Sequence, residues 1–468
     1  MLNTELCFTP ARTLARLIQS RKLSATEVVR AFIAQIERVN PKVNAIVTFL
    51  PDEALKAAKA FDRRKQKLPL GGLPVAIKDV IATKGVRTTW GSLIYKDHVP
   101  DEDHILAERL KNAGAILIGK TNTPEFAAGS QTFNEVFGAT RNPYDVSKTC
   151  GGSSGGAAVA VATGMVPFAD GGDFAASLRN PGNYCNVIGF RPSTGRVPAY
   201  PHPYPWSSLS ELGPMARTVA DAAFLLSVMA GPDARAPTSI AEPGSIFLKP
   251  LKRSFKKTRI AWSRDMGGLP VEPAVAKVLE AQRRVFKDLG CAIEEAEPDF
   301  SGATEAFETL RGLTYQHRIG ALIQEHRDKL KDTVIWNYEE GRKLGAPDIA
   351  KAEGLRTALY HRMRTFLEKY DFFICPVNQL PPFPVDQDYP SEIAGTKMAN
   401  YLDWMKSCYY ITITTHPAVS VPAGFTDDGL PVGIQIVGRY RDDLGVLQLA
   451  HAFEQATQAW KRRPPLAG

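Results

Sequence analysis

Apolar residues recur along this chain with two different patterns, one typical of helices and one of buried strands. After Ser24, apolar side chains follow at helical spacing from Val28 to Val39, and Pro41 is expected to end that helix. Glu27 stands three residues after Ser24, which is the pattern of a capping box at a helix start. The same reasoning predicts helices over 104–114, 156–169, 218–231 and 271–290, and a last helix near the carboxyl end.

Short apolar runs elsewhere predict the strands of a sheet. They cover residues 73–82, 114–122, 259–263, 372–377, 417–425 and 430–438. The runs interleave with the predicted helices, so the chain is expected to be an α/β protein. A linker near the middle of the chain is marked by prolines 232, 237, 243 and 250.

The length and composition fit a soluble globular protein with a large core. At 468 residues the chain exceeds a usual single domain, so length alone predicts two or three domains. Its hydrophobic fraction of 44% and charged fraction of 23% are ordinary. The net charge of +8 permits acidic partners, but the densest basic run, KRSFKK, holds only Phe255 as an aromatic residue. We therefore expect a solvated surface there and no nucleic-acid partner.

Cysteine usage and the amino-terminal segment bear on the compartment. Six cysteines are scattered without a C-x-x-C pair or the spacing of a zinc site, which predicts reduced thiols and no metal. The segment MLNTELCFTPARTLARL lacks the apolar core of a signal peptide. No apolar run reaches the ~18 residues of a membrane span. We expect a cytoplasmic protein that does not bind a membrane.

Lys78 is the first candidate for chemistry, because it lies inside the apolar run PVAIKDVIA. A structural interpretation is that its side chain reaches solvent or pairs with Asp79. A functional interpretation is that burial lowers the pKa of the amine, so that a neutral lysine acts as a general base near pH 7. The segment alone does not decide between the two.

Three serines stand in segments rich in small residues. Ser153 and Ser154 lie among four glycines in CGGSSGGAA, and GGDFAASLRNP presents Ser177. Each serine alone is more often an ordinary loop residue. The 24 residues from Ser153 to Ser177 are enough for a helix and a strand to bring the two together. With Lys78, these hydroxyls are the parts of a serine hydrolase that needs no histidine.

A longer set of motifs resembles the amidase signature family. In order along the chain these motifs are PVAIKD, GKTNTPEFA, GATRNPYDVSKTCGGSSGGAA, GGDFAASLRNP, GFRPSTGRVP, GPMARTVADAAFLLSVMAGPD and GLPVGIQIVG. The resemblance runs from about residue 5 to 455. It implies one large α/β/α domain around a mixed, twisted central sheet, against the expectation from length. Within that domain of residues 1–468, 60–230 would be the signature core, 1–59 a helical part, and 231–468 a smaller part that completes the sheet and pocket.

The same resemblance implies roles for the candidate residues. Lys78 falls on the general base of the family, Ser153 on a bridging serine that follows a cis peptide bond, and Ser177 on the nucleophile. The implied reaction cleaves the C–N bond of a carboxylic amide to an acid and an amine or ammonia, through an acyl-enzyme and without a cofactor. The implied partner is a small-molecule amide. Ester or urethane side activity and a homodimer remain open.

The loop before the nucleophile departs from the family pattern. Its backbone N–H groups would form the oxyanion hole, and they belong to Phe174, Ala175, Ala176 and Ser177. The family usually has threonine and two glycines where this chain has Phe-Ala-Ala, so the space beside the acyl group is expected to differ. The resemblance implies supporting roles for Ser154, Asp173 and Arg179.

The substrate pocket is less sharply predicted. Aromatic and polar candidates near the motifs are Phe126, Gln131, Phe133, Phe174 and Trp206. Ordinary core packing is the alternative for the aromatic residues among them. The segment ICPVNQLPP and the region of Trp404 are expected to approach the same cleft, because the resemblance implies that the carboxyl-terminal part builds some of it.

Three other functions compete with this interpretation. GAILIGKT (114–121) matches a nucleotide-binding loop, but its interior reads as a strand and no helix follows at once. An α/β-hydrolase would use Ser154 with His416 or His451 and would tolerate loss of Lys78. Within the family, the alternative is the A subunit of a tRNA-dependent amidotransferase, which is a glutaminase.

Overall fold

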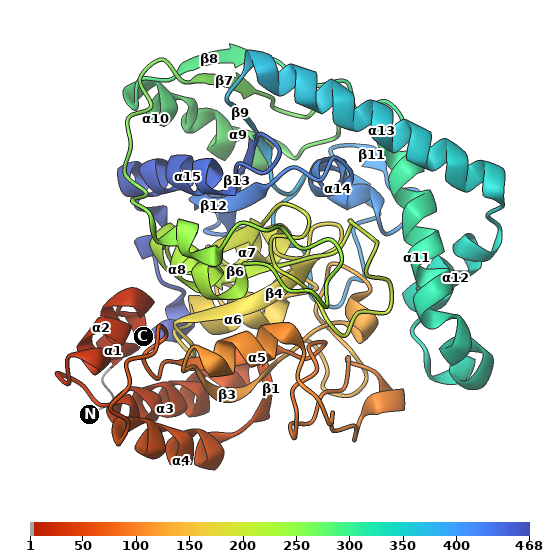
Figure 1. Cartoon of the computed structure of the whole chain (residues 1–468). Helices are drawn as coiled ribbons and strands as arrows, with labels where there is room; N and C mark the ends of the chain where they lie inside the picture. Colours follow the sequence, from red (N-terminus) through yellow and green to blue (C-terminus); the bar gives the residue numbers. More distant parts are fainter. Residues whose placement is uncertain (1–3) are drawn as a thin grey trace.

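A mixed sheet of eleven strands runs through the centre of the molecule (Figure 1). The computed structural model describes residues 4–468. In sheet order the strands are β1 (Ile46–Phe49), β3 (Ile116–Thr121), β2 (Pro74–Lys78), β4 (Phe168–Asp173), β6 (Glu211–Ala216), β5 (Ile188–Arg191), β12 (Ala418–Phe425), β13 (Pro431–Gly438), β9 (Phe372–Pro376), β7 (Arg259–Trp262) and β8 (Ala292–Glu295). β2 is parallel to β3 and β4, β7 is parallel to β8 and β9, and the other pairings are antiparallel.

Helices flank this sheet. They are α1 (Thr4–Phe8), α2 (Ala11–Gln19), α3 (Ala25–Val43), α4 (Pro51–Asp62), α5 (Ile105–Asn112), α6 (Gly155–Ala162), α7 (Arg179–Tyr184), α8 (Val219–Met229), α9 (Pro273–Ala281), α10 (Arg283–Asp288), α11 (Ala303–His326), α12 (Asp332–Arg342), α13 (Ala346–Lys369), α14 (Lys406–Ile413) and α15 (Asp443–Thr457). Short 3-10 turns cover Leu93–Tyr95, Glu125–Ala127, Gly244–Leu248, Arg327–Lys329, Asp403–Met405, Ala459–Lys461 and Pro465–Ala467. A small hairpin joins β10 (Glu392–Ile393) and β11 (Thr396–Lys397).

The central strands are apolar because helices cover them. α8 and α15 contact each other and central strands, and α6 and α7 form another contacting pair on the sheet. β2, β9 and β13 are buried along their whole length, which explains why they read as apolar runs. β5 is equally buried, but it was not among the predicted strands. These features confirm the predicted α/β class with a mixed central sheet.

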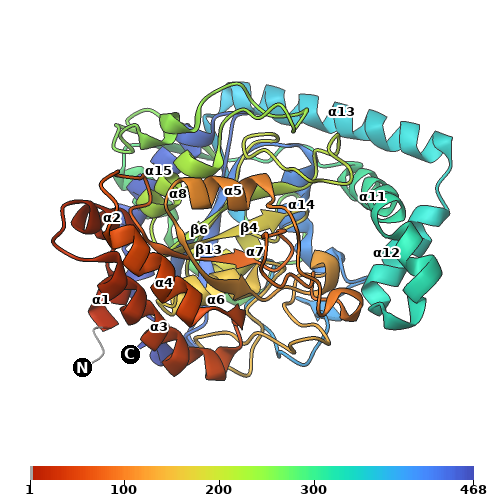
Figure 2. The ribbon, with the colours of Figure 1, turned by 60° about the horizontal axis from the view of Figure 1, so that its bottom comes forward.

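The first and last helical segments of the described residues lie on the same side of the molecule, beside α1–α4, while α11, α12 and α13 lie at the opposite side (Figures 1 and 2). The guanidinium of Arg463 pairs with Glu5 at 2.7 Å, and Arg38 in α3 donates to the carbonyls of Leu466 and Ala467. The last residues are therefore held against the first helices.

The predicted helix start at Ser24 is confirmed in detail. Ser24 Oγ accepts from the N–H of Glu27 at 3.1 Å, and the Glu27 carboxylate accepts from the N–H of Ser24 at 2.8 Å. The predicted end at Pro41 is wrong, because α3 continues to Val43. Pro41 lacks an N–H and its ring crowds the carbonyl four residues earlier, yet the last turn forms, since the N–H of Asn44 donates to the Asn40 carbonyl at 2.8 Å. Asn44, with φ of 51°, ends the helix.

Two other helix predictions have wrong boundaries. The segment 156–169 is helical only as far as Ala162, and its last residues turn into the buried strand β4. The segment 271–290 forms two helices, α9 and α10, which are separated at Gln282. Continuous apolar or amphipathic patterning does not show where a chain must turn to return to the sheet.

The arm formed by α11–α13 was not among the predicted elements. α11 packs against α12 and α13, and its Tyr315 and Ile319 form a hydrophobic cluster with Phe126 of the Glu125–Ala127 turn. The arm thus contacts a segment almost two hundred residues earlier in the chain. This contact covers one side of the site described below.

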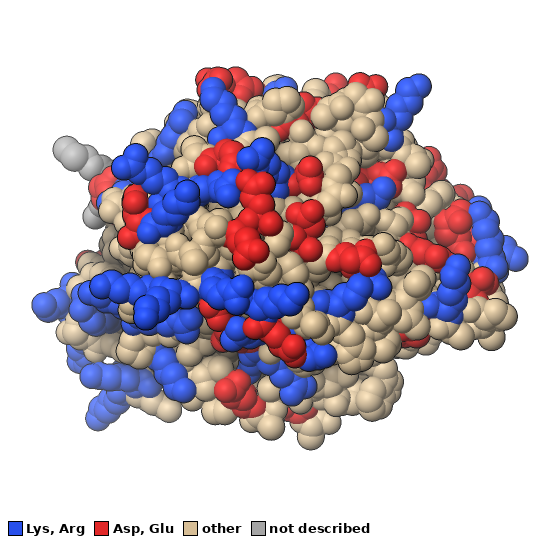
Figure 3. Space-filling model, turned by 90° about the horizontal axis from the view of Figure 1, so that it is seen from above, with Lys and Arg blue, Asp and Glu red and all other residues tan. Residues whose placement is uncertain are grey.

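The basic run 252–257 lies at the surface except for Phe255, which is buried and packs edge-on against Phe372. The exposed part of the run therefore lacks an aromatic side chain. Figure 3 shows a face on which bands of lysine and arginine are interspersed with aspartate and glutamate. Near β8, Arg264 and Arg283 both pair with Glu295.

Within residues 4–468, no helix combines the length and apolar character needed to cross a bilayer.

Candidate active site

Three separate segments bring Lys78, Ser153 and Ser177 into one region. Lys78 is the last residue of β2, while Ser153 and Ser177 each lie two residues before a helix, α6 and α7. The Nζ atom of Lys78 lies 2.7 Å from Ser153 Oγ and 2.9 Å from Ser154 Oγ. The N–H of Ser154 donates to the carbonyl oxygen of Ser177 at 3.2 Å, which joins the two serine loops.

The environment of Lys78 favours its neutral form. Its side chain is 1% exposed, and burial lowers the pKa to about 7 although Asp170 and Asp173 oppose the shift. A substantial part of the amine is therefore uncharged near pH 7. Asp79 is not its partner, because the Asp79 carboxylate accepts from Thr89. The interpretation in which the Lys78 side chain reaches solvent or pairs with Asp79 is therefore wrong.

Glycines around Ser153 permit close approach of the backbone. The Gly152–Ser153 peptide bond is cis, as the resemblance implied. A side chain at Gly152 would put its Cβ 2.9 Å from Thr132 Oγ1, so only glycine fits beside that threonine. Ser154 Oγ also accepts from the N–H of Gly172 at 3.2 Å and so links Lys78 to β4.

The hydroxyl of Ser177 is placed differently from those of Ser153 and Ser154. Ser177 is 5% exposed, and within the described part of the chain its Oγ makes no hydrogen bond. The structure therefore contains the Lys78–Ser153 contact of the predicted relay and sets Ser177 on the adjoining loop. Catalytic hydrogen bonds often tighten only when a substrate is bound.

A buried ionic network fixes the loop between β4 and α7. Arg179 donates through Nε and Nη2 to the two oxygens of Asp173, both at 3.0 Å, and through Nη2 to the Ala175 carbonyl at 2.8 Å. Both charged side chains are fully buried. Burial alone would raise the pKa of Asp173, but Arg179 and Arg191 hold it below its usual value. The N–H groups of residues 174–177 are therefore held on a rigid loop.

We expect Asp173→Asn to destabilise the protein strongly, because it leaves the buried cation of Arg179 without its charged partner. Loss of one member of such a pair costs about 3–5 kcal/mol. Asp427→Asn is the control, since Asp427 pairs with Lys277 at 2.8 Å on the exposed surface. Thermal unfolding should show a much lower Tm for the first variant and no measurable change for the second. Equal effects would contradict the structural role of Asp173.

A cavity of about 700 Å³ opens on Lys78 and Ser153. This volume is in the range of small-molecule sites. Phe126 and Phe174, both predicted as pocket residues, are part of its wall. No sequence signal pointed to other parts of the wall, which are Trp90, Tyr95, Tyr200, His202, Tyr315 and Arg318.

Four other residues expected near the pocket lie outside its lining. Trp206 is 72% exposed, and Trp404 is buried against Phe383. The Gln131 amide donates to the carbonyl of Asp388 at 3.0 Å, and the ring of Phe133 faces the ammonium of Lys331. Closeness to a motif in the sequence did not imply a side chain that faces the cavity.

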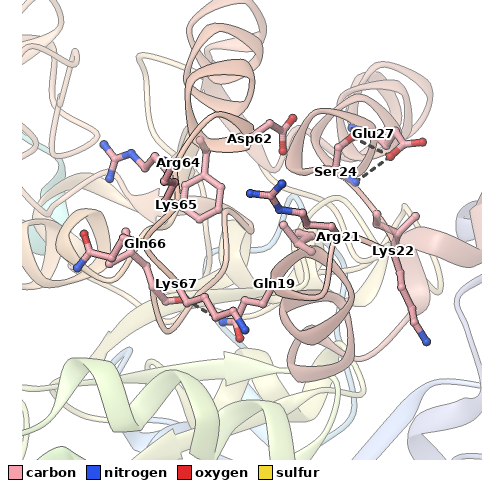
Figure 4. Close-up of a pocket in the computed structure, with 14 residues that line it drawn as sticks. Gln19, Arg21, Lys22, Ser24, Glu27, Asp62, Arg64, Lys65, Gln66 and Lys67 are labelled. Carbon is pink, nitrogen blue, oxygen red and sulfur yellow. Dashed lines mark hydrogen bonds between the residues drawn. The ribbon is translucent and has the colours of Figure 1, made fainter.

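A second cavity, of about 400 Å³, lies between the α2–α3 turn and the end of α4. Figure 4 shows basic side chains in its wall, among them Arg21, Lys22, Arg64 and Lys67, together with the acidic Glu27 and Asp62. None of the predicted catalytic residues lines it.

The structure disfavours two of the competing functions. Residues 116–121 form strand β3, and the ammonium of Lys120 donates to the Ile81 carbonyl at 2.6 Å, so this lysine is not free for a phosphate. His416 packs between Tyr360 and Tyr440, and His451 lies 3.7 Å from Glu454. Neither histidine accompanies Ser154, whose partner is Lys78.

Comparison with known proteins identifies the family. The family model Amidase matches residues 27–447. An acylamidase of Rhodococcus erythropolis is 35% identical over 473 residues, which cover 99% of this chain and 98% of the relative. The A subunit of the glutamyl-tRNA(Gln) amidotransferase of Moorella thermoacetica is 34% identical over 490 residues, 99% of both chains.

Solved structures agree with this assignment. A bacterial aryl acylamidase of the amidase signature family has a TM-score of 0.92 and 29% identity, and the match covers 98% of both chains. A 6-aminohexanoate cyclic dimer hydrolase complexed with substrate has a TM-score of 0.90 and 25% identity, over 99% of this chain and 100% of the other. The chain belongs to the amidase family. It is a hydrolase that acts on amides.

Proposed function

We propose that this chain works alone as an amidase that forms an acyl-enzyme on Ser177. The buried contact of 2.7 Å between Lys78 Nζ and Ser153 Oγ carries this proposal. Neutral Lys78 takes the proton of Ser153, Ser153 takes the proton of Ser177, and Ser177 Oγ attacks the amide carbonyl. The proton then returns through Ser153 to the departing amine, and water hydrolyses the acyl-enzyme.

The loop of residues 174–177 fits the role of oxyanion hole. Arg179 and Asp173 fix the loop, and each of the four residues retains its N–H group. Backbone donors of this kind contribute about 3–4 kcal/mol each in other enzymes. Ala175 and Ala176 are not among the residues with positive φ, so the replacement of the usual glycines causes no backbone strain at these positions. The Phe174 ring lines the cavity, whereas Ala175 and Ala176 are buried in a hydrophobic cluster behind it.

The wall of the cavity favours an amide with an apolar or aromatic body. Trp90, Tyr95, Phe126 and Phe174 supply large rings there, whereas glutamine would present a small polar side chain. We therefore favour a stand-alone amidase over the glutaminase role that the Moorella relative represents. All six cysteines are unpaired and buried, which supports our proposal of a reducing, cytoplasmic setting.

We expect the purified chain alone to release aniline from acyl anilides and to release little ammonia from glutamine. The reason is that aromatic rings in the cavity remove an apolar substrate from water, at about 25 cal/mol per Å² of apolar area. Amine and ammonia release over a panel of amides would measure this preference. Glutamine hydrolysis that required tRNA and further protein components would favour the amidotransferase alternative.

A further inference from the structure

Arg318 stands in the cavity wall without an acidic partner. It comes from α11 and lines the same cavity as Lys78 and Ser153. Within residues 4–468 its guanidinium makes neither a hydrogen bond nor an ion pair. Arg311, on the same helix, is by contrast fully engaged, since it donates to Asn337 at 2.7 Å and to Tyr401 at 2.8 Å. A desolvated cation that the protein leaves unpaired is available to a ligand anion.

Two of the three histidines that line the cavity, His104 and His202, add neutral donors. His104 Nδ1 accepts from the N–H of Leu106 at 3.1 Å, and His202 Nδ1 accepts from the N–H of Tyr204 at 3.2 Å. Burial lowers the pKa of His104 to about 3 and of His202 to about 4, so both rings are neutral at pH 7. A neutral ring that accepts at Nδ1 carries its proton on Nε2. In the described structure neither Nε2 donates to a protein group.

The remaining lining explains which ligand fits these donors. No aspartate or glutamate is among the described residues that line the cavity, so nothing in the wall opposes an anion. Across the described residues, no group of three or more His, Cys, Asp and Glu is placed to hold a metal ion. A guanidinium matches the two oxygens of a carboxylate in a planar, bidentate contact. The rest of the wall, with Trp90, Phe126 and Ile319, suits an apolar body.

We propose that Arg318, with the Nε2–H groups of His104 and His202, binds a carboxylate carried by the substrate. The preferred substrates would then be amides with an apolar or aromatic body and a carboxylate away from the scissile bond. This inference rests on the proposed function of the same cavity. It makes Arg318 a specificity-determining residue that has no part in the proton relay.

Matched substrate pairs test the inference in the full-length protein. One pair is 4-acetamidobenzoate and acetanilide, with the carboxylate on the amine side. The other is succinanilic acid and butyranilide, with the carboxylate on the acyl side. We expect the ratio of kcat/KM, charged over neutral, to exceed ten for at least one pair. Arg318→Met should lower that ratio about 10- to 100-fold, mainly through KM.

Two further variants separate charge recognition from general damage. Arg318→Lys keeps the charge but loses the planar guanidinium that contacts both carboxylate oxygens. It should therefore lower the charged-to-neutral ratio of kcat/KM less than Arg318→Met does. Arg327→Met is the control, because Arg327 pairs with Glu339 on the exposed end of the same arm. It should leave the ratio unchanged. A ratio near one in the wild type, or equal loss for Arg327→Met and Arg318→Met, would overturn the inference.

A binding measurement keeps the inference independent of turnover. Calorimetric titration of Ser177→Ala, which cannot hydrolyse the ligand, should show 4-acetamidobenzoate binding at least tenfold tighter than the isosteric 4-acetamidobenzamide, with the difference lost when Arg318→Met is added. Equal affinities in Ser177→Ala would overturn the carboxylate site even if the wild type hydrolyses amides. Selective binding without hydrolysis of any amide would sustain the site and contradict the proposed reaction. If Arg318→Met does not fold, the titration of Ser177→Ala and the Arg318→Lys variant still decide.

Discussion

Lys78→Ala is expected to lower kcat/KM for amide hydrolysis by about 10²- to 10⁴-fold, the usual contribution of a general base. The substitution removes the amine that lies 2.7 Å from Ser153 Oγ and 2.9 Å from Ser154 Oγ. Lys120, the buried lysine on the neighbouring strand β3, cannot replace it, because its ammonium donates to the Ile81 carbonyl. Steady-state kinetics on an acyl anilide would measure the loss.

Lys120→Met provides the matched control for this loss. It also removes a buried amine, from a strand parallel to β2, but from a group that touches neither serine. We expect it to lower Tm while kcat/KM stays close to the wild-type value in the folded fraction. Equal loss of activity in the two variants would indicate that Lys78 acts through stability alone.

The pH profile gives an independent test of Lys78. Because burial lowers its pKa to about 7, the neutral base becomes scarcer as the pH falls below that value. We therefore expect kcat/KM to decrease tenfold per pH unit below pH 7 and to level off above pH 7. Lys78→Arg should be inactive across the range, because an arginine does not lose its proton. A flat wild-type profile between pH 5 and 9 would contradict a lysine base.

Local signals in the sequence predicted six of the eleven strands of the sheet, whereas the contact between Lys78 and Ser153 followed only from the resemblance to the amidase signature family. The buried runs at 114–122 and 430–438 became β3 and β13, and the capping box at Ser24 formed as expected. These features depend on residues that are neighbours in the chain. The glycines around Ser153 also carried a local signal, since close approach of the backbone requires them.

The far wall of the cavity could not be predicted in this way. Tyr315, Arg318 and Ile319 come from α11, whose position depends on contacts with Phe126 and with α12 and α13. A helical period shows that a segment can form a helix, but it does not show which cavity that helix will close. Trp206 is the opposite case: it lies close to the motifs in the sequence, yet its side chain faces solvent and does not line the cavity.

Ser177→Ala is expected to have the largest effect of all, a loss of about 10⁴- to 10⁶-fold in kcat, because no acyl-enzyme can form without the nucleophile. A fluorophosphonate should label the wild type on Ser177, and the variant should not react. Peptide mapping by mass spectrometry would locate the label. Ser154→Ala serves for comparison, because Ser154 Oγ is tied to Lys78 and Gly172 and is expected to support the relay without being acylated.

The combination of Ser153→Ala with Ser177→Ala tests whether the two hydroxyls act as one unit. If Ser153 only carries protons between Lys78 and Ser177, its removal adds nothing once the nucleophile is absent. The double variant should then be no slower than Ser177→Ala alone, and both should retain the wild-type Tm within a few degrees. Multiplicative losses would show that Ser153 acts on the substrate by a separate route. Label on Ser154 in the wild type would instead transfer the nucleophilic role to that residue, and the acyl-enzyme would have to be reassigned.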